Sequence, residues 1–160
     1  MNRTKITAEP GKPTVIIERA FDAPKELLFR AYTEPELLAQ WLGPRGYEMK
    51  VERLEARDGG RYRYIHTDPE GNEYGFRGVF HGNPNSESII QTFEFEGWPG
   101  HVSLDSLWFE EREGKTVVRT VSSFQSTEDR DAMIESGMEK GVVQGHEQLD
   151  ELLQRLPAVS

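Results

Sequence analysis

The segment that most constrains the fold is the last long one, from Thr127 to Leu156. Its apolar residues recur at steps of three and four, and charged residues fill the positions between them, a pattern that predicts one amphipathic helix. Ser126 or Thr127 is placed to cap its start, and Glu128 and Asp129 suit the positive end of a helix dipole. A helix this long can cover one face of a sheet, so we expect the preceding residues to supply that sheet.

Three glycines, Gly137, Gly141 and Gly145, lie four residues apart and therefore on one side of this predicted helix. Each costs a helix roughly 1 kcal/mol relative to alanine, so the set needs a compensating role. In one interpretation, the glycines let the helix pack closely on aromatic side chains of the sheet. In the other, which we carry forward as a hypothesis, they leave space beside the helix for a ligand.

The preceding residues predict an antiparallel sheet and an α+β fold. Residues 14–21 have the β-branched alternation of a first strand. Asp22 is placed to cap a short helix with Pro24 in its first turn, and Thr33 or Glu34 begins a second short helix. Residues 47–124 then alternate between apolar and polar positions, with compact turns that divide them into six strands of a meander. The strand at 101–110 is hard to phase, and a bulge near Asp105 is one explanation.

Length and composition set the domain organisation and exclude several kinds of site. The 160 residues predict a single domain over 13–156, preceded by a flexible tail over 1–12. There are no cysteines, which excludes disulfides and thiolate zinc sites and fits the cytoplasm. A net charge of −9 disfavours nucleic acid as a partner. The sequence contains no apolar run of about 18 residues, so we predict no membrane span.

The four histidines do not predict a metal site. No two of them lie at the short spacing of a zinc motif, and no HExxH sequence occurs. We interpret His146 and Asp150, one helical turn apart, as a solvated pair. No metal ligand and no cofactor is therefore predicted.

Catalysis is considered through one possible acid–base arrangement. His66 or His101 beside Glu94 or Asp105 would form a base with an orienting partner, but surface ion pairs are the favoured interpretation. No nucleophile elbow or Ser-His-Asp order appears, so we predict no catalytic residue. Trp98 lies in a glycine- and proline-rich loop and is either part of an ordinary turn or part of a lid.

Candidate ligand-binding residues come from aromatic and polar side chains on alternating strand positions and from the glycine side of the helix. Most of the aromatic rings are expected in the core, but a subset is predicted to line a cavity. Tyr64, His66 and Gln91 would bring polar atoms onto otherwise apolar faces, where they need hydrogen-bond partners. The predicted set is Trp41, Tyr62, Tyr64, His66, Phe76, Gln91, Phe93, Gly137, Met138 and Gly141.

Several stretches, taken together, resemble a known family. They are Phe21-Asp22-Ala23-Pro24, Leu28 to Thr33, Gly43-Pro44-Arg45-Gly46, Gly59-Gly60-Arg61, Asp68-Pro69-Glu70-Gly71, Gly78-Val79-Phe80 and Gln91-Thr92-Phe93-Glu94. They resemble bacterial proteins similar to the C-terminal domain of the activator of the Hsp90 ATPase, in the START-like (SRPBCC) superfamily. The resemblance runs from about Val15 to Leu153.

The resemblance implies a helix-grip fold, with a curved antiparallel sheet around a long C-terminal helix and two short helices after the first strand. Superfamily members use the cavity between sheet and helix for different molecules and reactions, so fold alone does not assign an activity. We expect non-enzymatic binding of a small apolar or amphipathic molecule by a monomer or homodimer. The alternatives are an enzyme of the polyketide cyclase or hydrolase kind using the same cavity, and a chaperone-linked interaction module.

Overall fold

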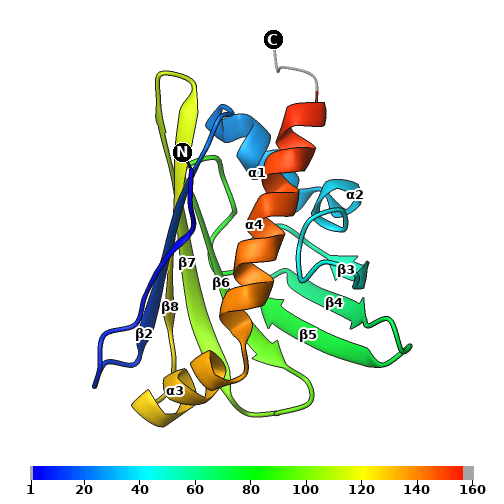
Figure 1. Ribbon diagram of the computed structural model, residues 1–160, viewed down its shortest axis with the longest axis vertical. Coiled ribbons are helices and arrows are strands. Elements are labelled where there is room, and N and C mark those ends of the chain that lie inside the picture. The colour runs from blue at the N-terminus through cyan, green and yellow to red at the C-terminus, as the bar shows by residue number, and fades with distance from the viewer. Residues whose placement is uncertain (1, 157–160) are drawn as a thin grey trace.

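The computed structural model describes residues 2–156 and contains one eight-stranded antiparallel sheet with four helices (Figure 1). The strands are β1 (Lys5–Thr7), β2 (Thr14–Phe21), β3 (Glu48–Leu54), β4 (Arg61–Thr67), β5 (Glu73–Val79), β6 (Ser88–Phe95), β7 (Val102–Arg112) and β8 (Lys115–Ser123). The helices are α1 (Lys25–Thr33), α2 (Pro35–Leu38), α3 (Thr127–Glu135) and α4 (Met138–Arg155). The predicted α+β class, the six-stranded meander and the helix-grip arrangement are confirmed.

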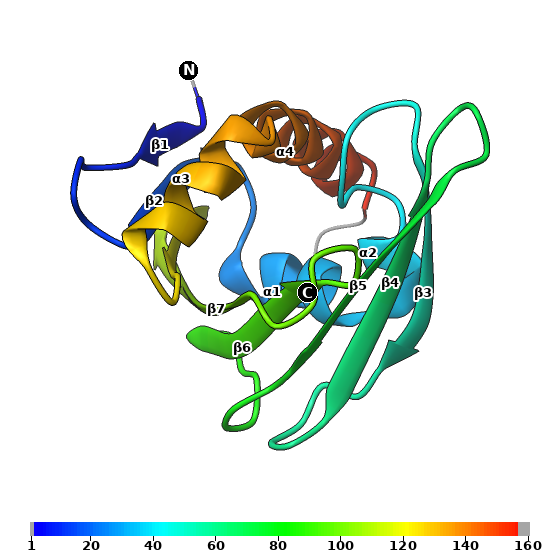
Figure 2. The same ribbon diagram turned by 90° about the horizontal axis from the view of Figure 1, so that it is seen from below.

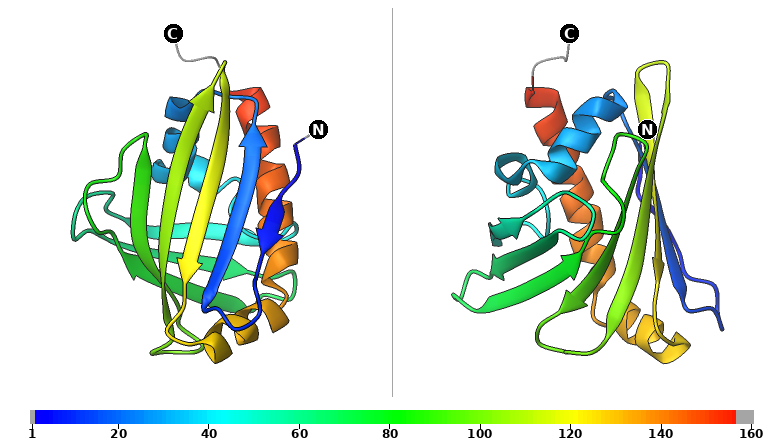
Figure 3. Two further views of the ribbon diagram at one scale, coloured as in Figure 1. Left: turned by 90° about the vertical axis from the view of Figure 1, so that its left-hand side faces the viewer. Right: turned by 180° about the vertical axis from the view of Figure 1, so that it is seen from behind.

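The sheet is strongly curved and wraps around the helices, as the view from below shows (Figure 2). Its strand order is β1-β2-β8-β7-β6-β5-β4-β3, so β2 joins the meander through β8. The sheet bends sharply between β5 and β6, so that β3 to β5 cross the direction of β7 and β8 (Figure 3). β5 and β6 pair through only two residue pairs, with an isolated bridge between Phe80 and Gln91. A Cβ on Gly78 would lie 2.0 Å from the Thr92 carbonyl oxygen. Glycine is therefore needed where β5 approaches β6.

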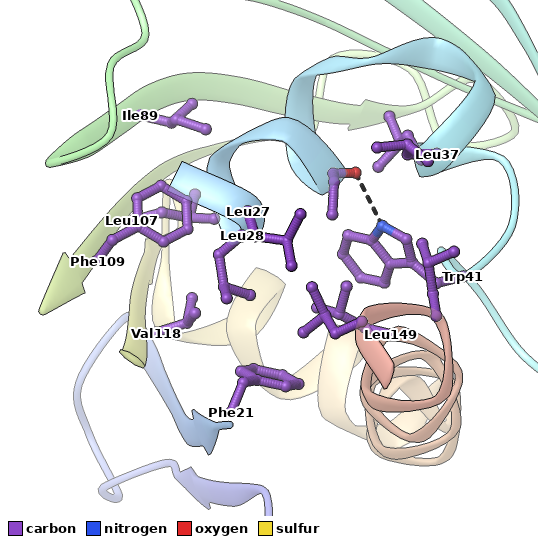
Figure 4. Packing of buried hydrophobic residues seen from close by; sticks show 14 of the residues in the cluster. Phe21, Leu27, Leu28, Leu37, Trp41, Ile89, Leu107, Phe109, Val118 and Leu149 are labelled. Atoms are coloured by element: carbon purple, nitrogen blue, oxygen red, sulfur yellow. Dashed lines mark hydrogen bonds between the residues drawn. The ribbon is translucent and has the colours of Figure 1, made fainter. Parts of the chain in front are cut away.

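All four helices lie on the concave side of the sheet, and the outer face of β2, β8 and β7 carries none (Figure 3). The main core forms where α1, α2 and the C-terminal half of α4 meet the sheet, around Phe21, Leu28, Val118 and Leu149 (Figure 4). These four side chains are at most 1% exposed. Burying each such side chain stabilises the fold by about 1.5–3 kcal/mol.

Trp41 connects the short helices to this core. Its indole nitrogen donates a 2.9 Å hydrogen bond to the Ala31 carbonyl oxygen at the end of α1 (Figure 4). The ring packs edge-on against Tyr32, with 4.7 Å between the ring centroids. Because the indole N–H has a partner, this large ring is buried without an unsatisfied polar group.

The predicted single C-terminal helix is wrong, because the segment divides at Gly137. This residue has φ +87°, in the left-handed region that favours glycine, and it separates α3 from α4. The predicted cap is confirmed at Ser126, whose Oγ accepts a 3.1 Å hydrogen bond from the Asp129 amide. Gly141 and Gly145 remain within α4, so only two of the three glycines share a helix face.

Two local predictions also differ from the structure. The N-terminal segment predicted as a flexible tail contains β1, which pairs with β2 through residues 5–7. The proposed bulge near Asp105 is absent, because β7 keeps an unbroken register with β8 through this position. Instead, Leu104 and Trp108 face outward, with 44% and 42% of their surfaces exposed, while the odd-numbered residues face inward.

Candidate functional site

A cavity of about 310 Å³ lies between the concave face of the sheet and the first half of α4. This volume is at the lower end of the range typical of small-molecule sites, about 300–1,000 Å³. The lining is mainly apolar and aromatic. It comprises Ile17, Tyr32, Leu38, Trp41, Leu42, Gly43, Tyr64, His66, Phe76, Ile89, Gln91, Phe93, Ser103, Asp105, Leu107, Thr120, Ser122, Phe124, Met133, Met138, Gly141, Val142, Gly145 and His146.

Most of the predicted site residues come together around this cavity, although the sequence separates them by as much as a hundred positions. The lining includes eight of the ten, namely Trp41, Tyr64, His66, Phe76, Gln91, Phe93, Met138 and Gly141. The strand residues among them project from β4, β5 and β6, and Met138 and Gly141 belong to α4. Alternation along each strand therefore places the predicted polar residues Tyr64, His66 and Gln91 on the concave face.

The remaining two, Tyr62 and Gly137, are outside the lining. Tyr62 is 1% exposed, and its hydroxyl donates to the Thr92 carbonyl oxygen while its ring packs over Gly78. It therefore supports the junction of β5 with β6. Gly137 forms the left-handed connection between α3 and α4, and a Cβ placed there would meet nothing within 4 Å. Its conformation, rather than free space, accounts for the glycine.

The two glycines within α4 face the loop at residues 41–44. A Cβ on Gly145 would lie 3.4 Å from both the Gly43 nitrogen and the Trp41 oxygen, and a Cβ on Gly141 would lie 3.5 Å from a carbon of Pro44. Gln148 Nε2 donates to the carbonyl oxygens of Trp41, at 3.1 Å, and Gly43, at 2.9 Å. The glycine face thus combines close packing on this loop with a border on the cavity.

His66 presents an imidazole to the cavity. The ring packs edge-on against Phe76, with 5.0 Å between centroids, and lies against Gly43, where a Cβ would come within 2.6 Å of His66 Cε1. Burial lowers the pKa of His66 to about 4, so the ring is neutral near pH 7. Among residues 2–156, the ring forms no side-chain hydrogen bond, and its Nδ1 lies against Gly43, where a Cβ would come within 2.7 Å.

On β7 and β8, beside Gln91 of β6, polar residues missing from the predicted set form a patch of the lining. In the strand register, Asp105 lies directly opposite Gln91 on β6 and opposite Ser122 on β8. Ser103 Oγ donates a 3.1 Å hydrogen bond to Asp105 Oδ1. Burial raises the pKa of Asp105 to about 6, and hydrogen bonds from Ser122 and Ser103 oppose that rise.

Sequence reasoning missed this patch because the phase of β7 was misleading. The outward positions of this strand carry Leu104 and Trp108, whereas the inward positions carry Ser103 and Asp105 before Leu107 and Phe109. Ser122 and Thr120 on the neighbouring strand lie at alternate positions. That alternation is the signal that would have supported the correct phase.

His146 is not the solvated partner of Asp150 that we predicted. It is 8% exposed, borders the cavity, and its Nδ1 forms a 2.8 Å hydrogen bond with Thr4 Oγ1. Burial, helped by the positive charge of Arg19, lowers the pKa of His146 to about 4. Arg19 Nη1 also donates a 2.9 Å hydrogen bond to the His146 carbonyl oxygen. The N-terminal segment and β2 thereby hold this part of α4.

The acid–base pairings considered from the sequence are not formed as hydrogen-bonded pairs within residues 2–156. His101 instead bonds to Asp129 of α3, at 3.0 Å, and Glu94 pairs with Arg77, at 3.1 Å. His66 and Asp105 both border the cavity, but they belong to β4 and β7, which two strands separate in the sheet.

Trp98 is 38% exposed and stacks on His101, with 3.6 Å between the ring centroids. Its ring is outside the cavity lining. The stack joins the β6–β7 loop to the start of β7, and the His101 contact with Asp129 extends this connection to α3.

This curved sheet, closed by a long helix over an apolar cavity, defines a class of helix-grip proteins, and sequence comparison identifies the family. Residues 22–154 match the family model described as "Activator of Hsp90 ATPase homolog 1-like protein". The chain therefore belongs to this family, and the resemblance noted from its motifs is confirmed. A search of curated proteins found no match.

Solved structures of bacterial proteins share the fold over nearly the whole chain. A Rhodobacter sphaeroides protein is 29% identical, with a TM-score of 0.87 over 96% of this chain and 99% of the other. A Staphylococcus epidermidis protein is 28% identical, with a TM-score of 0.79 over 96% and 98%. A Mycobacterium smegmatis protein is 24% identical, with a TM-score of 0.86 over 96% and 98%, which shows a common fold alone.

Two further properties concern the described part of the chain. None of its helices combines the length and apolar character needed to cross a membrane. Within residues 2–156, no three His, Cys, Asp or Glu side chains cluster in a way that could hold a metal ion.

Proposed function

We propose that this protein binds a small apolar or amphipathic molecule in the cavity between its sheet and α4, without catalysing a reaction. The observation that carries the proposal is the cavity itself, about 310 Å³ in volume and lined mainly by apolar and aromatic side chains. Such a surface is better covered by an apolar ligand than by water. A few polar groups among apolar walls are typical of sites that orient a ligand.

The polar groups of the lining fit binding better than acid–base chemistry. A general base usually has an orienting partner within hydrogen-bond reach. His66 has no such partner in the described chain, and Asp105 bonds to Ser103 rather than to an imidazole. Tyr64, His66 and Gln91 are thus proposed to orient a ligand. Location in the cytoplasm and a monomeric or dimeric state stay predictions.

The proposal is tested by filling the cavity from α4. Val142 borders the cavity, whereas its neighbour Val143 is 36% exposed and outside the lining. Val142→Phe places a larger side chain against the cavity, and Val143→Phe makes the same chemical change beside it. Equilibrium dialysis with 1-ethylnaphthalene, a neutral apolar probe, measures binding to the wild-type protein and both variants.

We expect saturable binding by the wild type and by Val143→Phe, and a loss of at least about tenfold in affinity for Val142→Phe, equivalent to about 1.4 kcal/mol. Circular dichroism and thermal melts confirm that both variants are folded. Failure of the wild type to bind the probe, or unchanged affinity in a folded Val142→Phe variant, would contradict the proposal. Native mass spectrometry of freshly purified protein gives a second test, through a bound small molecule that Val142→Phe does not retain.

A further inference from the structure

The polar patch on β7 singles out one carboxylate. Asp105 lies in the middle of β7, between Gln91 on β6 and Ser122 on β8, and its side chain borders the cavity. Its carboxylate accepts hydrogen bonds from Ser103 Oγ, at 3.1 Å, and from Ser122. An ionised carboxylate has about four acceptor positions, so about half of its capacity is open to a molecule in the cavity.

Asp105 also lacks a cationic partner in the part of the chain that the structure describes. None of the ion pairs among residues 2–156 includes this carboxylate. Two acidic residues of the neighbouring strand β6 are paired, Glu96 with Arg63 at 2.7 Å and Glu94 with Arg77 at 3.1 Å. Removing a carboxylate from water is costly unless a positive charge or several hydrogen bonds compensate it. The position is therefore suited to a ligand that brings a positive charge.

The apolar part of the lining indicates the chemical character of the rest of that ligand. Phe76 and Phe93 stack with 5.5 Å between their centroids, and Ile89, Leu107 and Val142 border the same space. These surfaces suit a compact apolar or aromatic body. The net charge of −9 also favours the approach of cations over that of anions.

We propose that the preferred ligand is a compact apolar molecule carrying one protonated amine, which forms a charge-assisted hydrogen bond with Asp105. This inference rests on the proposed function, because it specifies the chemical class of ligand for the same cavity. Gln91 and Ser122, the cross-strand neighbours of Asp105, are placed to accept further hydrogen bonds from the ammonium group through their side-chain oxygens.

The other titratable groups bordering the cavity keep one charge state over the working pH range. Burial lowers the pKa of both His66 and His146 to about 4, so both rings are neutral above pH 5. Burial raises the pKa of Tyr32, of Tyr64 and of the neighbouring Tyr62 above the ordinary value of 10.0. Asp105, whose pKa is about 6, is thus the cavity group that changes charge between pH 5 and 7.5.

The experiment compares two probes of nearly equal shape, 1-naphthylmethylamine and 1-ethylnaphthalene, by equilibrium dialysis at pH 7.5. Asp105→Asn removes the charge with little change in volume. Glu110→Gln, an equivalent change at an exposed residue on the outer face of β7, is the matched control. We expect the amine to bind the wild type and Glu110→Gln about tenfold more tightly than 1-ethylnaphthalene, as one charge-assisted hydrogen bond permits.

In Asp105→Asn, the amine should lose about tenfold in affinity while 1-ethylnaphthalene binds within about twofold of wild type. With the wild-type protein, lowering the pH from 7.5 to 5 should weaken amine binding and leave 1-ethylnaphthalene unaffected, a result that does not depend on any variant. If 1-ethylnaphthalene binds but the amine gains nothing from Asp105, the inference is overturned and the proposed function stands. If neither probe binds the wild type, both fail.

Discussion

The two halves of α4 face the same sheet but enclose different interiors. The C-terminal half places Leu149, Leu152 and Leu153 into the core, where each is at most 6% exposed. In the N-terminal half, Gly141, Val142 and Gly145 border the cavity, and the two glycines pack on the loop at residues 41–44. Long side chains fill the space under one half, and short side chains leave it open under the other.

Short side chains alone do not maintain that space, because a helix can move toward the sheet and close it. Here α4 is held by the loop that follows α2. Gln144 Oε1 accepts a 2.9 Å hydrogen bond from the Arg45 amide, and Gln148 donates to the carbonyl oxygens of Trp41 and Gly43. The comparison teaches that an open cavity needs both missing side-chain volume and a support that prevents collapse.

The largest expected difference between the halves is in stability. Leu149→Ala removes a fully buried side chain from the core and should lower the free energy of unfolding by about 2–5 kcal/mol. Met138→Ala, beside the cavity and already half-exposed, should lower it by less than about 1 kcal/mol. Urea denaturation of both variants provides the measurement. Equal losses would show that the two halves are packed alike.

The next prediction concerns pH, because the cavity half holds buried ionisable groups. The pKa of His66 and that of His146 are lowered to about 4 from an ordinary value of 6.5, so their contribution to stability is present above pH 6.5 and is lost as the pH falls toward 4. The raised pKa of Asp105 acts in the opposite direction, with stability gained as the pH falls from about 6 to 3.8.

Two histidines outweigh one aspartate, so the free energy of unfolding should fall between pH 6.5 and 4.5. Each histidine contributes up to about 3 kcal/mol over its full titration. His66→Gln should make the decline shallower, and Asp105→Asn should make it steeper. Urea denaturation at a series of pH values checks both. His81→Gln, at an exposed histidine, is the control, and an equal effect from it would contradict the assignment to the cavity.

The smallest expected effect is the difference in stability between alanine substitutions at Gly137 and at Gly141. Gly137→Ala places a side chain at φ +87° and should cost about 1–2 kcal/mol. Gly141→Ala, inside α4 with 3.5 Å to Pro44, should gain up to about 1 kcal/mol from helix propensity. Thermal melts of the two variants resolve the opposite signs. Loss of stability in both would show that Gly141 packs as tightly as its neighbours allow.

Much of the architecture was predictable because it depends on local patterns. Alternation identified the meander, and three- and four-residue spacing identified the apolar face of α4. On β4, the alternation of Tyr62, Tyr64 and His66 gave the correct inner face, since a strand turns successive side chains to opposite sides. Eight of the ten predicted site residues border the cavity for this reason.

The remaining features depended on contacts between distant residues. The helix break at Gly137 requires a left-handed backbone conformation. Glycine permits this conformation, but a glycine in the sequence does not predict it. Tyr62 shares its face with Tyr64, yet its contact with Gly78 and Thr92 takes it out of the lining. His146 is buried because Thr4 and Arg19 meet it from segments more than 120 residues away.

The sequence by itself determined the fold class, the family and the inward phase of most strands, because these follow from spacing along the chain. The tertiary structure alone decided that Asp105 borders the cavity and forms no ion pair within residues 2–156. Exposed Leu104 and Trp108 concealed the phase of β7, and the charge environment of a carboxylate depends on residues that only the folded sheet brings near. The ligand chemistry proposed for this cavity therefore depends on tertiary contacts rather than on a sequence motif.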